Sequence, residues 1–261
     1  MKLHLTEKQG RTLVELHRLF GARQCVLIGA TALGFRVHMS RSTKDVDLAV
    51  AAPIEDLPGL LELGGWRRDR AIRHRWYSAE GTPADILPVT PDLIEAGEVS
   101  FGDGLIMSLV GFDLVLRHTT HEEIPGTGMR IEVAELPVLV LLKMVAWLDR
   151  PSERSRDLED LATILDHALA DEDERRWDLD HPVGESGLHH EDQGAYFVGL
   201  EVGRIIQDHH RAPINRFLEK VGDPDSIWFA QMVQKARYVG VKPDEILERR
   251  WAAFRRGLNS L

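Results

Sequence analysis

The chain has 261 residues, of which 43% are apolar and 28% charged, a composition typical of a globular protein with a substantial core. Its net charge of −10, from 32 basic and 42 acidic residues, argues against a protein whose main task is to coat nucleic acid. No apolar run approaches the roughly 18 residues that a membrane-spanning helix needs, so we expect no membrane segment.

The N-terminal residues and the cysteine content indicate the compartment. The opening sequence MKLHLTEKQG has no apolar core followed by a small-residue cleavage site, and we expect no signal peptide. The single cysteine, Cys25, excludes an internal disulfide framework. We therefore expect a cytoplasmic protein.

The N-terminal half has the alternating pattern of a mixed α/β domain. Helices are predicted where apolar residues recur at helical spacing, and strands where short apolar runs end at turn residues. The predicted helical segments are 6–20, 30–37, 57–63 and 92–96. The predicted strands are 24–28, 45–50, 73–79, 84–89, 105–110, 112–117 and 129–133.

From Pro137 onward the pattern becomes helical. The predicted helices begin near 137 and then cover 153–169, 195–210, 227–238 and 244–258, with a polar, histidine-rich loop at 178–192. We therefore predict an α+β protein in which a catalytic module at 1–135, with helices flanking a mixed sheet, is followed by an all-helical domain at 136–261.

An Asp-x-Asp pair opens the predicted strand 45–50. Alternate side chains of a strand point to the same side, so Asp45 and Asp47 project together, about 6.5–7 Å apart along the backbone. Two carboxylates this close raise each other's pKa unless a cation lies between them. Mg²⁺ prefers hard oxygen ligands and is commonly held by one or two carboxylates together with substrate phosphates. The pair therefore predicts a magnesium site.

A glycine turn precedes this pair. Gly29 allows the chain to turn tightly from strand 24–28 into the next helix, whose N-terminus offers free N–H groups and a partial positive charge to a phosphate. Thr31 adds a hydroxyl at the same place. Magnesium-binding carboxylates that face a phosphate-binding turn are the components that nucleotidyl transfer requires.

Residues 28–50 resemble the nucleotidyltransferase superfamily that includes DNA polymerase beta and the aminoglycoside nucleotidyltransferases. The sequence pattern is most similar to that of the AbiEii-like branch of abortive-infection and toxin–antitoxin enzymes. Its G-x-x-A-L turn and its R-x-T-x-D-h-D-L segment correspond here to 29–33 and 41–48. The resemblance covers about residues 20 to 165, and the chain departs from it at Ala30, where the superfamily has Gly or Ser.

The resemblance implies three acidic metal ligands. Asp45 and Asp47 would bridge two magnesium ions, one on the triphosphate and one on the attacking group. Asp85, in the strand PADILPV, would hold the second metal and help to deprotonate the nucleophile. Two such ions would stabilise both the attacking and the leaving oxygen.

The resemblance also implies a set of nucleotide-binding residues. Gly29, Ala30 and Thr31 would cradle the β- and γ-phosphates. Arg41 and Lys143 are candidates for neutralising the phosphate charge. Lys143 lies among apolar residues, so the alternative is a side chain that snorkels to water.

Two charged segments have alternative interpretations. The segment 156–161 (RDLEDL) corresponds to an R-D-h-x-D-h motif of the same branch, yet it also suits an interhelix salt-bridge set that docks the helical half. The basic, tryptophan-containing segment 66–76 could stack bases and bind phosphates of an RNA acceptor, or it could form a solvated β-hairpin.

These observations predict a Mg²⁺-dependent nucleotidyltransferase that moves a nucleoside monophosphate from a nucleoside triphosphate such as ATP to an acceptor. RNA or a protein side chain is the expected acceptor, as in type IV toxin–antitoxin systems, with an antitoxin as a candidate partner. One alternative is a small-molecule enzyme of the aminoglycoside type, whose cationic substrate would suit the acidic chain. Another is an inactive member of the fold that only binds a nucleotide or a partner; Ala30 favours it and the three acids argue against it.

Overall fold

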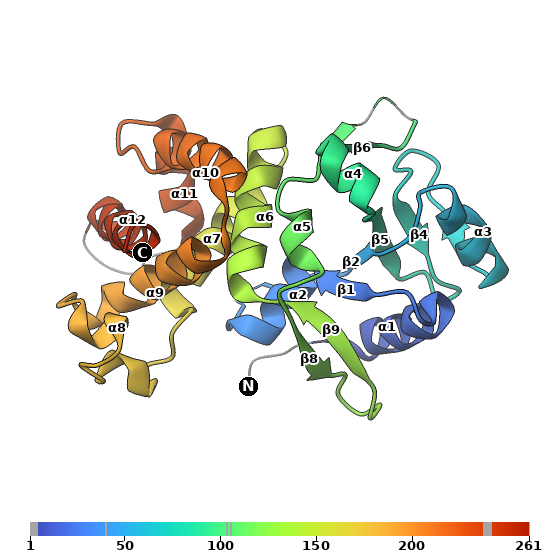
Figure 1. Cartoon of the computed structure of the whole chain (residues 1–261), viewed down its shortest axis with the longest axis horizontal. Helices are drawn as coiled ribbons and strands as arrows, with labels where there is room; N and C mark the ends of the chain where they lie inside the picture. The colour runs from blue at the N-terminus through green and yellow to red at the C-terminus, as the bar shows by residue number, and fades with distance from the viewer. Residues whose placement is uncertain (1–4, 40, 103, 105, 237–241, 261) are drawn as a thin grey trace. The chain divides into compact units, whose positions relative to one another are not determined.

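The computed structural model describes residues 5–39, 41–102, 104, 106–236 and 242–260. The chain divides into two compact units, Met1–Leu139 and Val140–Leu261 (Figure 1). In the described part of the chain, each helix is too short or too polar to cross a membrane.

A mixed sheet forms the centre of the first unit. In the described residues it has seven strands in the order β3-β4-β5-β2-β1-β9-β8. The pairs β2–β5 and β1–β9 are parallel and the others are antiparallel, so the predicted mixed sheet is confirmed. Its strands are β1 (Cys25–Ile28), β2 (Val46–Val50), β3 (Arg67–Arg68), β4 (Arg75–Tyr77), β5 (Pro83–Pro88), β8 (Thr119–Glu123) and β9 (Arg130–Ala134).

Helices flank this sheet, as predicted. Helix α1 begins at a capping box, in which the Thr6 hydroxyl accepts from the backbone N–H of Gln9 while the Gln9 side chain accepts from Thr6. Helix α2 packs against β1, β2 and β9. The helices are α1 (Glu7–Phe20), α2 (Gly29–Arg36), α3 (Asp56–Leu63), α4 (Pro91–Ala96) and α5 (Phe112–Val115), and a separate hairpin consists of β6 (Glu98–Ser100) and β7 (Ile106–Ser108).

Part of the strand prediction is wrong. The segment 112–117, predicted as a strand, begins with the short helix α5. Gly111, with φ of 90°, turns the chain into this helix, and Phe112, Leu114 and Val115 are all buried. A short apolar run buried on several sides has no periodicity that separates strand from helix. Strand β8 was not predicted, because its sequence TTHEE is polar, as is common for a strand at the edge of a sheet.

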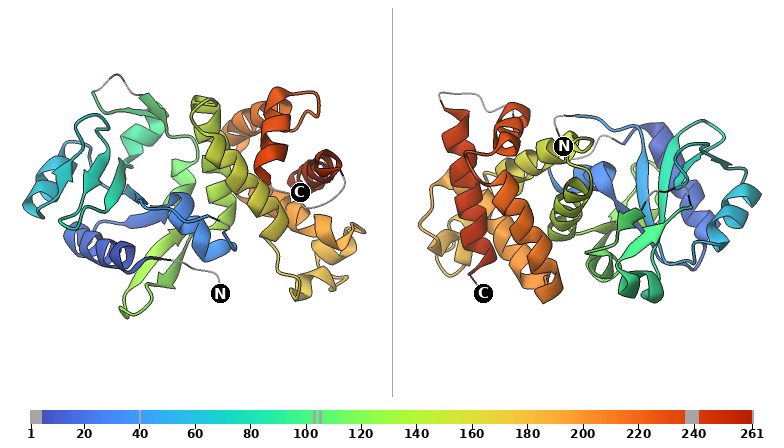
Figure 2. Two further views of the ribbon diagram at one scale, coloured as in Figure 1. Left: turned by 180° about the vertical axis from the view of Figure 1, so that it is seen from behind. Right: turned by 90° about the horizontal axis from the view of Figure 1, so that it is seen from above.

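The second unit is built of helices (Figure 2, yellow to red). The predicted helix 195–210 is two helices, because the chain breaks at Ile206 and Gln207, and α8 lies inside the predicted loop 178–192. The last two residues of predicted helix 227–238 lie outside the described residues. The helices are α6 (Leu136–Asp149, which begins in the first unit), α7 (Ser155–His167), α8 (Pro182–Glu185), α9 (His190–Ile205), α10 (Asp208–Val221), α11 (Ile227–Ala236) and α12 (Pro243–Leu258).

Helices α9 and α12 cross with their backbones in close contact. A Cβ atom on Gly199 would lie 2.0 Å from the carbonyl oxygen of Phe254, and one on Gly257 would lie 2.1 Å from that of Tyr196. Only hydrogen fits at these two positions, so the two glycines set how closely the helices approach. The close crossing of α9 and α12 therefore depends on two residues that carry no side chain.

Candidate active site

Three aspartates meet at one end of the central strands. Asp47 on β2 is the register partner of Asp85 on the parallel neighbour β5, so the two side chains point to the same face of the sheet. Asp45 directly precedes β2. Each of the three offers a carboxylate oxygen, and these oxygens all lie within 4.8 Å of one another. The structure thus brings together the three acids that the sequence singled out.

Gly29 lies directly against this cluster. Strand β1 pairs with β2 so that Ile28 is opposite Asp47, and the chain turns into α2 at Gly29 with φ of 70°. A Cβ atom on Gly29 would lie 2.1 Å from Oδ2 of Asp47 and 2.7 Å from its Cγ. Glycine is needed here both for the left-handed backbone and for the space that the Asp47 carboxylate occupies.

Asp45 is held by three neighbouring side chains. The Thr43 hydroxyl donates a short hydrogen bond to Oδ1 of Asp45, and the Thr31 hydroxyl donates to the Asp45 main-chain carbonyl at 2.8 Å. The Gln9 amide donates to the same carbonyl at 3.3 Å. Because Thr31 is buried and bonded in this way, its hydroxyl ties the first turn of α2 to the start of β2.

The remaining phosphate-site candidates of the first unit lie around α2. Gly29, Ala30 and Thr31 form its first turn, and the N-cap residue Ile28 makes no side-chain cap within the described part of the chain. The half-buried Arg41 lies in the bend between α2 and β2. The first N–H groups of α2, which begin at Gly29, therefore lie beside Asp47 of the aspartate cluster.

Arg75 is the site residue that the sequence did not identify. It stands opposite Asp85 across the antiparallel pair β4–β5. Its Nε donates to Oδ1 of Asp85 at 2.7 Å and its Nη2 to Oδ2 at 2.8 Å, while Nη2 lies 3.5 Å from Oδ2 of Asp45. The hydrogen bonds to Asp85 raise the pKa of Arg75, so the guanidinium stays charged. The sequence did hold a signal for Arg75, because a hairpin with its turn at Glu80-Gly81 brings Arg75 opposite Asp85. The composition of the basic cluster alone does not show which of its arginines faces the aspartates.

A family model described as nucleotidyl transferase AbiEii toxin, type IV TA system, matches residues 11–235. The chain belongs to the AbiEii family. A comparison with curated proteins found no match. The family assignment confirms the resemblance and the nucleotidyltransferase activity inferred from the sequence, and it extends the similarity from residue 165 to 235, well into the helical unit.

Lys143 of this AbiEii chain lies on α6 in the second unit and is buried. Its ammonium group is 3.1 Å from Asp157 and 2.5 Å from Asp160, both on α7, so it does not snorkel to water. Burial lowers the pKa of Lys143, but the attraction of the two carboxylates outweighs burial and raises it overall. The segment 156–161 therefore takes part in interhelix ion pairs through its two aspartates, with Lys143 as their partner, while Arg156 is exposed.

The basic segment 66–76 forms the antiparallel hairpin β3–β4. Trp66 and Trp76 are 3% and 2% exposed, so they offer no ring face to a base, and the predicted stacking surface is wrong. Arg68 lies 5.5 Å from the ring centre of Trp76 and donates to the carbonyl of Arg73. The hairpin interpretation is correct, with Arg75 as its inward-facing member.

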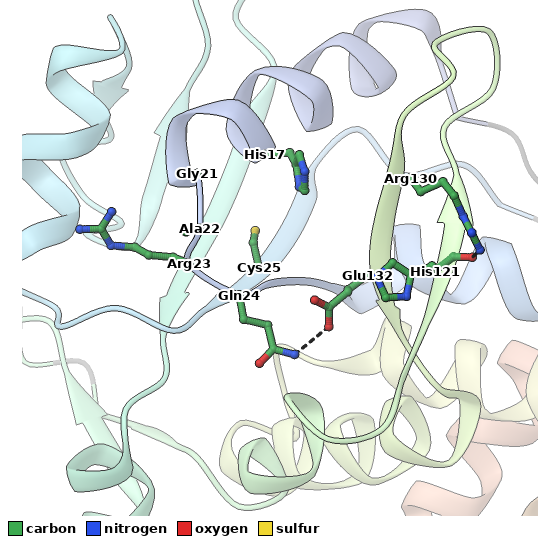
Figure 3. A pocket seen from close by; sticks show the side chains of 9 residues that line it. All are labelled: His17, Gly21, Ala22, Arg23, Gln24, Cys25, His121, Arg130 and Glu132. Atoms are coloured by element: carbon green, nitrogen blue, oxygen red, sulfur yellow. Dashed lines mark hydrogen bonds between the residues drawn. The ribbon is translucent and has the colours of Figure 1, made fainter.

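A pocket of about 300 Å³ lies at the other end of β1 (Figure 3). Its wall includes Cys25, the first residue of β1, whereas the aspartate cluster lies beside Ile28, the last one. Burial, with a smaller contribution from Glu132, raises the pKa of Cys25 to about 12, so the thiol stays protonated at neutral pH. The Gln24 amide donates to Glu132 at 2.7 Å across the pocket. This pocket therefore offers no thiolate at neutral pH and none of the three aspartates.

Proposed function

We propose that this chain is a Mg²⁺-dependent nucleotidyltransferase that transfers a nucleoside monophosphate from a nucleoside triphosphate to RNA or to a protein side chain. The observation that supports this most strongly is the cluster of Asp45, Asp47 and Asp85 beside the Gly29 turn, in a chain of the AbiEii family. An antitoxin partner and a cytoplasmic location belong to the same proposal.

The residues of the cluster fit a divalent cation. Three carboxylates from β2, β5 and the residue before β2 offer oxygens within 4.8 Å of one another, and hard oxygen ligands are what Mg²⁺ prefers. The close approach of Gly29 to Asp47 fixes that carboxylate in place. We propose that the three aspartates hold two ions. Bound Mg²⁺ would neutralise phosphate charge and make the attacking group more acidic.

The protein's own groups supply the other tasks in this proposal. Asp85 accepts the proton of the attacking hydroxyl, and the first turn of α2, from Gly29 to Thr31, donates backbone N–H groups to the phosphates. Arg41 contributes positive charge to nucleotide binding, whereas the charge of Lys143 is already taken up by Asp157 and Asp160. We assign the chemistry to a catalytic domain at 1–135 and propose a separate helical domain at 136–261.

The decisive experiment is label transfer. The protein is incubated in turn with each of the four nucleoside triphosphates labelled at the α-phosphate, together with total RNA, total protein or an aminoglycoside. We expect RNA or protein to become labelled, and Asp47→Asn to reduce labelling at least 100-fold, since a metal ligand is lost. The exposed Asp56 on α3 gives the matched control, and Asp56→Asn should label like the wild type.

Two results would replace the proposal with one of its rivals. Label on the aminoglycoside alone identifies a small-molecule enzyme. Tight nucleotide binding without label on any acceptor identifies a binding member of the fold. Equal labelling by the wild type and by Asp47→Asn removes the aspartate cluster from the mechanism.

A further inference from the structure

Arg75 is a positively charged side chain that contacts two members of the aspartate cluster. Both oxygens of Asp85 accept from it, at 2.7 and 2.8 Å, and the same Nη2 that binds Asp85 reaches toward Asp45 at 3.5 Å. The side chains of Arg75 and Asp85 are 25% and 13% exposed. A two-pronged arginine–carboxylate pair of this kind is stronger than an exposed ion pair, because the geometry is fixed and water is partly excluded.

The cluster needs such a cation. Three carboxylates whose oxygens lie within 4.8 Å of one another repel one another strongly in a partly buried site. His74 is a second basic group near Asp85, but its Nε2 lies 3.8 Å from Oδ2 of Asp85, and the imidazole carries charge only when protonated. Arg75 is charged at every relevant pH and is the closer of the two.

The other arginines of the hairpin do not share this position. Arg67, Arg70 and Arg73 are exposed, and Arg68 donates to a main-chain carbonyl. The inward direction of Arg75 follows from its register opposite Asp85 on β5. A single arginine on β4 is therefore placed to act on the cluster.

We propose that Arg75 competes with divalent cations for the oxygens of Asp85 and Asp45, and that it thereby couples cation binding to nucleotide binding. This proposal rests on the proposed function for the identity of the ligands. An ion that takes Asp85 as a ligand either displaces one of the two hydrogen bonds from Arg75 or shares the carboxylate with the guanidinium, whose positive charge repels the ion. A triphosphate offers the released guanidinium new acceptors of the same charge, which favours release. The cation alone should then bind weakly, and cation and nucleotide should strengthen each other.

The test measures Mn²⁺ binding by electron paramagnetic resonance, with and without a non-hydrolysable triphosphate analogue. We expect Arg75→Gln to bind Mn²⁺ alone at least tenfold more tightly than the wild type, which corresponds to about 1.4 kcal/mol. We also expect the gain in Mn²⁺ affinity on adding the analogue to shrink at least tenfold. The exposed Arg73 lies two residues away, and Arg73→Gln should match the wild type in both measurements.

A second variant guards against a folding defect. Arg75→Lys keeps the charge but loses the two-pronged geometry, so its Mn²⁺ affinity should fall between those of the wild type and Arg75→Gln. Loss of Mn²⁺ binding in Asp47→Asn assigns the signal to this cluster. Unchanged or weaker Mn²⁺ binding in both Arg75 variants overturns the inference. Since no turnover is measured, failure of label transfer would refute the proposed function and leave this inference standing.

Discussion

Replacing Gly29 with alanine tests the packing of the turn against the Asp47 carboxylate. The substitution has two separable effects. An L-residue at φ of 70° costs about 1–2 kcal/mol. The new Cβ would also meet three atoms of Asp47, at 2.1, 2.7 and 2.9 Å, and overpacking of this kind costs about 1–3 kcal/mol more. We expect a total destabilisation of about 2–5 kcal/mol.

The matched control for this change is Gly97→Ala. Gly97 has φ of 72°, but a Cβ there would meet nothing within 4 Å, so this variant has the backbone effect alone, about 1–2 kcal/mol. Urea unfolding of both variants gives the difference, which is the contact with Asp47. In an Asp47→Ala background, which removes the two closest atoms, the difference should fall by at least about 1 kcal/mol.

Activity should respond more strongly than stability. Displacement of the Asp47 carboxylate by about 1 Å is expected to lower label transfer about 100-fold under conditions where the protein stays folded. The reasoning is refuted if Gly29→Ala unfolds at the same urea concentration as Gly97→Ala, since the crowding of Asp47 would then have no energetic consequence.

Three further changes test the packing and charges of the two units. Gly199→Ala should destabilise the chain by about 3 kcal/mol in a thermal melt, because the α9–α12 crossing leaves no room for a methyl group. The control Gly59→Ala, in open space on α3, should stabilise the chain by about 0.5–1 kcal/mol. Equal effects of the two substitutions would contradict the close crossing. Thr31→Val removes the hydroxyl that donates to Asp45 and should cost about 1–2 kcal/mol in urea unfolding, and a neutral result would mean that this bond adds nothing. Lys143→Met should cost about 3–5 kcal/mol at neutral pH, because two buried carboxylates lose their partner. Since the folded protein raises the pKa of Lys143 above its ordinary 10.5, this difference should be constant between neutral pH and pH 10.5 and shrink as the pH rises through the folded-state pKa. A difference that does not depend on alkaline pH would contradict the charge-based explanation.

The carboxylates and the turn of the candidate site could be predicted because local rules determine them. Strand alternation placed Asp45 and Asp47 on one side, and the strand-to-helix glycine indicated the tight turn at Gly29. Asp85 was identified through the family resemblance, and the parallel register of β2 and β5 places it beside Asp47. These features need only the chain's own periodicity and the resemblance to a family.

The features that sequence reasoning missed depend on contacts between distant segments. Which arginine of the basic hairpin faces inward is decided by its register against β5, and Arg75 looks like its neighbours in the sequence. The partners of Lys143 lie on the next helix, so its burial could be anticipated but not its ion pairs. Strand β8 lies at the sheet edge, where polar and charged residues are common, and its sequence TTHEE has no apolar residue on which strand prediction could rely.

The register in which β5 pairs with β2 limits where residues can be inserted or deleted in this chain. Between the two strands lie α3 and the hairpin β3–β4, and a shift of one residue within β5 would turn Asp85 to the opposite face of the sheet. Insertions and deletions should therefore be tolerated in the surface turns around α3, while even a single deletion within β4 or β5 should abolish function. Among related chains, we expect differences in length to occur before the hairpin β3–β4, around α3, and to be absent from β4 and β5.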